Sequence, residues 1–247
     1  MSYMYVANWK MNLTFRQSLQ FCKNNTEKLM HLADQAQLII CPSFVSLYPI
    51  TQLLHNTHIN YGAQNCSEYK SGSHTGEISA ESLAEIGVRY CIVGHNERRT
   101  EQGETTQSII NKIEQLFTHA ITPIICIGET KEDHKAGATN EIIEAQLKPI
   151  LTSIAHNQST QHIIIAYEPV WAIGSTIIPD IAQLTQIFDS IVTLCHRIDA
   201  NNQTSLLYGG SVNPDTINQL KQIQNISGFL IGTASTSIES LEKIITL

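Results

Sequence analysis

The chain has 247 residues, of which 42% are hydrophobic and 15% are charged. This length suits one (β/α)8 barrel of roughly 250 residues, and it is also enough for two smaller domains. The formal net charge is -7 and the Lys and Arg residues are scattered, which excludes an extended basic face for nucleic acid. The beginning of the chain has no charged segment followed by a long apolar stretch, so we expect neither export nor a membrane span.

Six cysteines stand far apart in the sequence and form no CxxC pair. This spacing favours reduced thiols over a disulfide framework or a zinc site. We therefore expect a reducing, cytoplasmic compartment.

Short apolar runs rich in β-branched residues recur along the whole chain and predict buried strands. They cover residues 3–7, 38–41, 59–63, 90–93, 121–127, 163–167, 206–208 and 229–231. Segments with helical spacing of apolar residues lie between them. Asn213, Pro214 and Asp215 place a capping side chain, a proline and an acid in the order typical of a helix start, which predicts a helix from residue 215 to about 222.

No linker, low-complexity tract or sequence repeat divides the chain. Eight alternating strand and helix units predict a single α/β domain over residues 1–247, a (β/α)8 barrel of parallel strands ringed by helices. An open, doubly wound sheet with fewer strands is the alternative.

In such a barrel the active site forms where the strands end, and polar residues follow several of the predicted strands. Glu168 comes directly after the apolar residues 163–167, where a carboxylate at the mouth of a barrel can serve as a base. The alternative is a glutamate that faces solvent. His95 follows residues 92–94 and is either a partner of Glu168 or a structural histidine.

Lys10 is the only cation at the end of the first predicted strand, where it either polarises a substrate oxygen or lies exposed. Gly209, Gly210 and Gly232 follow the last two strands. Backbone N–H groups there can hold a phosphate, although Gly209 and Gly210 also fit a tight turn. No histidine spacing indicates a metal site, and we expect no cofactor.

These segments together resemble the triosephosphate isomerase family, in family order over almost the whole chain. The matching blocks are Asn8-Trp9-Lys10-Met11-Asn12, Gly62-Ala63-Gln64-Asn65, Thr75-Gly76-Glu77-Ile78-Ser79, Gly94-His95 with Glu97-Arg98-Arg99, Cys126-Ile127-Gly128-Glu129, residues 166–174, and Tyr208-Gly209-Gly210-Ser211-Val212.

The resemblance implies the interconversion of dihydroxyacetone phosphate and glyceraldehyde 3-phosphate. It implies that Glu168 shuttles a proton between two carbons, and that His95 is a neutral electrophile. Asn8 and Lys10 would bind substrate, with Glu97 supporting Lys10. The family's phosphate site falls on the main-chain N–H groups of Gly174, Ser211, Gly232 and Thr233. It also implies a homodimer in which the loop around Thr75 inserts beside the partner's site.

Three departures from the family pattern stand out. Asn96 replaces the usual serine beside both catalytic side chains, and Thr233 replaces a usual glycine. Pro179 lies five residues after Gly174 where the family has seven, so the loop after Gly174 is two residues shorter.

Two other functions fit parts of the pattern. A Schiff-base aldolase would use Lys10 as its nucleophile. A non-catalytic barrel that kept the phosphate pocket is the second, and it is motivated by Asn96 and the shortened loop.

Overall fold

A computed structural model of the chain describes residues 3–157, 162–173, 179–198 and 203–247. Within these ranges the eight predicted strands are confirmed, each within two residues of its predicted ends. They are β1 (Met4–Asn8), β2 (Gln37–Cys41), β3 (Asn60–Ala63), β4 (Tyr90–Val93), β5 (Thr122–Ile127), β6 (Ile163–Tyr167), β7 (Thr204–Tyr208) and β8 (Gly228–Ile231).

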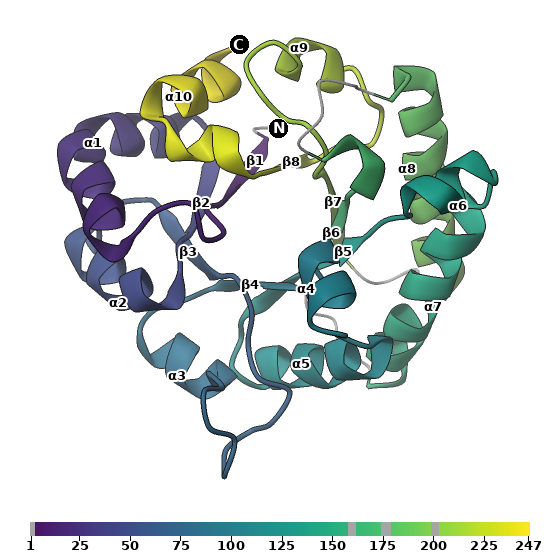
Figure 1. Ribbon diagram of the computed structural model, residues 1–247, viewed down its shortest axis with the longest axis horizontal. Coiled ribbons are helices and arrows are strands. Elements are labelled where there is room, and N and C mark those ends of the chain that lie inside the picture. Colours follow the sequence, from purple (N-terminus) through teal and green to yellow (C-terminus); the bar gives the residue numbers. More distant parts are fainter. Residues whose placement is uncertain (1–2, 158–161, 174–178, 199–202) are drawn as a thin grey trace.

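The strands form a closed parallel barrel in chain order, from β1 to β8. The barrel closes where Met4 to Ala7 of β1 pair with Gly228 to Ile231 of β8. Figure 1 looks down this barrel, with the strands as an inner ring and the helices around them. The predicted barrel is confirmed. The alternative of an open sheet is ruled out, because an open sheet has two unpaired edge strands and here every strand pairs with two neighbours.

The helices cover the outside of the barrel. They are α1 (Phe15–Gln35), α2 (Phe44–Leu53), α3 (Ala80–Glu85), α4 (Asn96–Glu101), α5 (Thr106–Thr118), α6 (Lys131–Lys135), α7 (Thr139–His156), α8 (Ile181–Ile198), α9 (Ile217–Leu220) and α10 (Ile238–Thr246), with 3-10 turns η1 (Val170–Ala172) and η2 (Thr233–Thr236). In the described part of the chain, no helix has the length and apolar character that crossing a membrane requires.

Strand residues alternate between two apolar cores because successive side chains of a strand point to opposite faces. Met4 and Val6 of β1 belong to the core inside the barrel, whereas Tyr5 and Ala7 belong to the core between strands and helices. Ile164 and Ala166 of β6 also lie in the inner core. This alternation sets which residues face the barrel mouth when the strands end.

The predicted helix from 215 to about 222 was wrong in extent. Only α9 (Ile217–Leu220) is α-helical, and it is preceded by turns in which Asn213 Oδ1 accepts from the N–H groups of Asp215 and Thr216. The Thr216 hydroxyl donates to the carbonyl of Ser211. These local side-chain bonds compete with the helical ladder and delay its start.

A buried ion cluster joins the end of β4 to the two helices that follow. The Glu104 side chain is 2% exposed and lies 2.5 Å from Arg98 Nε and 3.0 Å from Lys112 Nζ. It also accepts the N–H of Gly94. Burial raises the pKa of Glu104, but the two cations and this N–H group lower it by a larger amount. The net shift of the pKa is therefore downward.

We expect Glu104→Gln to lower the free energy of unfolding by about 3–5 kcal/mol at neutral pH, because two cations lose their buried partner. The depressed pKa of Glu104 adds stability above its unfolded value of about 4.3, and this stability is lost as the pH falls through the lower folded value. The difference between wild type and variant should therefore shrink in acid. Urea unfolding at fixed protein concentration measures it, with Glu27→Gln as the exposed control. A difference that is constant with pH would contradict the assignment.

Candidate active site

Asn8 and Glu168 reach the barrel mouth because they continue the inward phase of their strands. Asn8 follows Met4 and Val6 at intervals of two, and Glu168 follows Ile164 and Ala166 in the same way. Both side chains are buried, and the exposed fraction of Glu168 is only 3%. The alternative of a solvent-facing Glu168 is wrong.

His95 reaches the same place by a different route. Gly94 has a φ of 69°, a left-handed backbone that glycine adopts without strain. A Cβ at Gly94 would lie 2.8 Å from Ile109 Cδ1 and 2.9 Å from an Arg99 nitrogen. Glycine therefore permits the sharp turn after β4 that aims His95 inward and places it at the N-cap of α4.

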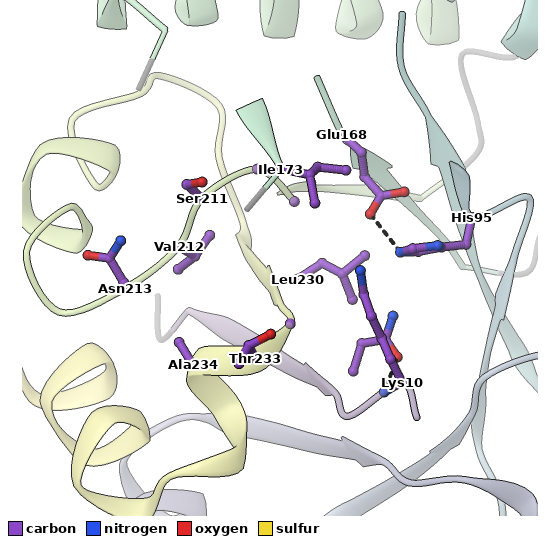
Figure 2. Close-up of a pocket in the computed structure, with 14 residues that line it drawn as sticks. Lys10, His95, Glu168, Ile173, Ser211, Val212, Asn213, Leu230, Thr233 and Ala234 are labelled. Atoms are coloured by element: carbon purple, nitrogen blue, oxygen red, sulfur yellow. Dashed lines mark hydrogen bonds and ion pairs between the residues drawn. The ribbon is translucent and has the colours of Figure 1, made fainter. Parts of the chain in front are cut away.

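The two side chains meet across the barrel mouth, with Glu168 Oε1 3.1 Å from His95 Nε2 (Figure 2). The backbone N–H of Glu97 points at His95 Nδ1 from 3.4 Å, at the start of α4. Because Nδ1 accepts this contact, the proton of a neutral ring belongs on Nε2, facing Glu168. The assignment rests on the hydrogen-bond pattern.

The pKa values of this pair shift in opposite directions. Burial lowers the pKa of His95, but the Glu168 carboxylate raises it by more, so the net shift is upward. Burial raises the pKa of Glu168, and His95 and then Lys10 lower it, for a net shift downward. The pair therefore stabilises an ionised carboxylate in the protein without ligand.

Lys10 is held in a strained loop beside this pair. Its φ is 50°, which is uncommon for a residue other than glycine and costs about 1–3 kcal/mol. Lys10 Nζ lies 2.6 Å from Glu97 Oε1, and the Gln64 side chain donates to the carbonyl of Lys10 at 3.0 Å. The surrounding contacts thus fix the backbone and the ammonium group, whose side chain is 23% exposed.

Small residues form the opposite wall of the site. Ser211, Gly232 and Thr233 line the cavity, and Thr233 begins the 3-10 turn η2. The hydroxyl of Ser211 donates to the carbonyl of Ala172, which ties this wall to the segment after Glu168. Gly174, and the shortened loop after it, lie outside the described residues.

One cavity of about 320 Å³ brings these side chains together. Figure 2 shows Glu168, His95 and Lys10 at one end and Ser211, Asn213 and Thr233 at the other. Among the described residues that line it, Lys10 is the only lysine or arginine. Among the described residues, no group of three or more His, Cys, Asp or Glu side chains could hold a metal ion.

Some residues in or beside the site were not predicted as site residues. Leu230 lies in the inward phase of β8 and forms the apolar floor, and strand periodicity could have indicated it. Cys126, at the end of β5, helps to lower the pKa of the Glu168 carboxyl, and no sequence pattern marked it for that effect. Asn96 starts α4, and its buried Nδ2 has no hydrogen-bond partner within the described part of the chain.

The fold and the site define a (β/α)8-barrel enzyme that carries a buried carboxylate, an imidazole and one cation at the mouth of its barrel. Comparison with known proteins identifies the family. The family profile described as triosephosphate isomerase matches residues 3–247. The chain belongs to the triosephosphate isomerase family, and it is an intramolecular isomerase that interconverts triose phosphates.

Curated relatives agree along nearly the full length. The triosephosphate isomerase of Aquifex aeolicus is 41% identical over 241 residues, which cover 97% of this chain and 96% of that protein. The triosephosphate isomerase of Wolbachia sp. subsp. Brugia malayi is 40% identical over 248 residues, covering 99% and 97%. That of Coxiella burnetii (strain Dugway 5J108-111) is 38% identical over 243 residues, covering 96% and 94%.

The missing side chain of Gly209 makes room for Glu168, because a Cβ there would lie 2.8 Å from Glu168 Cγ. We expect Gly209→Ala to push the carboxylate away from His95. A displacement of about 1 Å can lower the turnover rate about 100-fold. Kinetics with glyceraldehyde 3-phosphate, a thermal melt and a crystal structure of the variant check this. A variant of unchanged turnover would show that Glu168 does not depend on this space.

Proposed function

We propose that this chain interconverts dihydroxyacetone phosphate and glyceraldehyde 3-phosphate through an enediol(ate), with Glu168 as the base. The observation that carries this proposal is the 3.1 Å contact between Glu168 Oε1 and His95 Nε2 inside one buried cavity. The reaction belongs to glycolysis and gluconeogenesis. It moves only protons between isomers, so it consumes no cofactor.

Glu168 removes a proton from C1 of dihydroxyacetone phosphate, and the electron pair of the C–H bond forms the C1–C2 double bond of the enediolate. The same carboxyl group returns the proton to C2 and becomes a carboxylate again. Burial supports this role because it shields the Glu168 carboxylate from water. The net lowering of the Glu168 pKa keeps the group ionised before substrate binds.

His95 serves as a neutral electrophile that moves protons between the two oxygens. A ring with its proton on Nε2 can donate to a substrate carbonyl and recover a proton from the neighbouring hydroxyl. The N–H of Glu97 at Nδ1 and the N-terminus of α4 favour the neutral form, because both present partial positive charge to the ring. They oppose the Glu168 carboxylate, which raises the pKa of His95 in the protein without ligand. The neutral-imidazole mechanism is the established one for this family.

Lys10 and Asn8 bind substrate and polarise its oxygens, and Glu97 positions Lys10. The 2.6 Å ion pair between Lys10 and Glu97 supports these roles. A preorganised ammonium group in a partly buried site stabilises negative charge that develops on an enediolate oxygen. The phosphate is held at the other end of the cavity by main-chain N–H groups of Ser211, Gly232 and Thr233. The family pattern adds the N–H of Gly174, which lies outside the described residues.

Neither alternative has the same support. A Schiff-base aldolase needs the free amine of Lys10, and here the ammonium is paired with Glu97. Borohydride with substrate would trap such an aldolase covalently and would leave the proposed isomerase unmodified. A non-catalytic barrel that only binds a phosphate ligand does not require a buried carboxylate in contact with an imidazole.

Removal of the base tests the proposal. We expect Glu168→Gln to lower turnover by at least about 10³-fold, because the amide cannot accept the carbon-bound proton. A coupled assay with glyceraldehyde 3-phosphate measures it, and Glu27→Gln, an exposed glutamate on α1, serves as the control. Equal rates for wild type and Glu168→Gln would remove the assignment and leave the non-catalytic barrel.

We further propose that residues 1–247 form one catalytic domain that works as a homodimer in the cytoplasm. Five exposed apolar side chains support an interface, in the loop before α1 and in the first half of α1 and of α2: Met11, Phe15, Phe44, Val45 and Tyr48. The loop around Thr75 projects from the barrel between β3 and α3 (Figure 1) and would insert beside Lys10 of the partner. Six free, buried cysteines suit a reducing cytoplasm.

We expect sedimentation of the purified protein to give a molecular mass twice the 27.5 kDa of one chain. Val45 is 70% exposed in the single chain, so burying an aspartate there would destabilise the dimer. Val45→Asp should therefore shift the equilibrium toward monomer and lower turnover in dilute solution. Met30→Asp, which changes an exposed apolar residue outside this group, is the control. A wild-type chain that stays monomeric at micromolar concentration would rule out the dimer.

A further inference from the structure

A second group of polar side chains lies behind the active site and is used by none of the roles above. Its centre is Glu129, which is fully buried at the end of β5. The Tyr167 hydroxyl donates to both of its carboxylate oxygens, at 3.1 and 3.0 Å, and Trp171 Nε1 donates to Oε1 at 2.8 Å. Both donors are neutral groups, so neither of them places a positive charge beside this carboxylate.

His134 is the group that can supply the missing charge. Its Nδ1 lies 3.6 Å from Glu129 Oε1, and its ring stacks on the indole of Trp171 with centroids 4.2 Å apart and an angle of 27°. Among the residues that the structure describes, no lysine or arginine lies within 4.0 Å of the Glu129 carboxylate. The His134 side chain is 28% exposed, so protons from solvent reach its ring.

This cluster is attached to the backbone that carries Glu168. Trp171 stands three residues after Glu168 in the turn η1, and the N–H of Val170 donates to the carbonyl of Glu129 at 3.1 Å. The carbonyl of Ala172, in the same turn, accepts from Ser211 on the wall of the cavity. Contacts of Glu129 and Trp171 therefore restrain the direction in which the chain leaves Glu168.

We propose that His134 is a positioning residue whose protonation strengthens the hold of Glu129 on Trp171 and so stabilises the ligand-binding arrangement of Glu168. An imidazolium gains both a cation–π contact with the indole and an ionic contact with the carboxylate, and the neutral ring has only the stack. The effect on the site rests on the proposed role of Glu168.

Other titratable groups around His134 do not replace it. Tyr167 and Tyr208 face Glu129 from β6 and β7, and burial followed by the Glu129 charge raises the pKa of both phenols, so they stay neutral. On its own helix α6 the neighbours are Lys131, Glu132, Asp133 and Lys135. Asp133 is engaged in the capping box with Thr130.

Tryptophan fluorescence tests the contact without any ligand. The chain has two tryptophans, and the other, Trp9, is buried against Phe21. A protonated imidazole quenches an indole that it stacks on, so emission should fall as the pH drops from about 8 to about 5. We expect His134→Gln and His134→Phe to lose this transition. His58→Gln, which removes an exposed histidine paired with Asp34, should keep it. A transition that persists in His134→Gln would overturn the proposal.

Binding of 2-phosphoglycolate, a phosphate that carries a carboxylate, tests the coupling to the site. Relative to wild type, His134→Phe should bind about threefold more weakly at about pH 5.5 and equally at about pH 8, because it keeps the stack without the charge. His134→Arg keeps both at every pH, so it should match wild type in acid and bind about threefold more tightly at about pH 8.

Each result has a distinct meaning. Variant-to-wild-type ratios that do not change with pH would show that His134 contacts Trp171 without positioning the site, and the proposal would be wrong. If wild type binds no phosphoglycolate, the proposed function fails instead, and the fluorescence titration still decides whether His134 clamps Trp171.

Discussion

Closure of the barrel between β1 and β8 is the constraint on which the rest of the structure depends. Once Met4 to Ala7 pair with Gly228 to Ile231, every strand has two neighbours and the carboxyl ends of all the strands meet at one mouth. Polar residues that are far apart in sequence then share a small, buried space. The contact between His95 and Glu168, 73 positions apart in the numbering, is a direct consequence.

Two different devices aim side chains into that space. Asn8 and Glu168 simply continue the inward alternation of their strands. His95 depends on the left-handed turn at Gly94, and the empty position at Gly209 leaves room for the carboxylate. The two glycines are therefore as necessary to the site as its reactive side chains, because a closely packed apolar core leaves no other space for them.

Charge in the site is balanced by neighbours that touch no substrate in the proposed mechanism. Glu97 holds Lys10, and the N–H of Glu97 meets the ring of His95. Behind the loop that follows Glu168, Glu129 binds Tyr167 and Trp171 and lies beside His134. Lys10 and Glu129 thus both have partners on other elements, which tie the site to the surrounding helices.

Strand periodicity and the polar residues after each apolar run favoured a barrel over an open sheet and made Glu168, His95 and Lys10 candidates, because buried strands and their ends carry local patterns. The resemblance to a family, and not these patterns, gave the three residues their expected roles. The start signal at Asn213, Pro214 and Asp215 predicted a helix in this region but not its extent, since the Thr216 hydroxyl donates to the carbonyl of Ser211. Only the tertiary structure decided the contact of His95 with Glu168, the space at Gly209 and the cluster around Glu129. These depend on distances between different strands, and no local pattern in one chain encodes such distances.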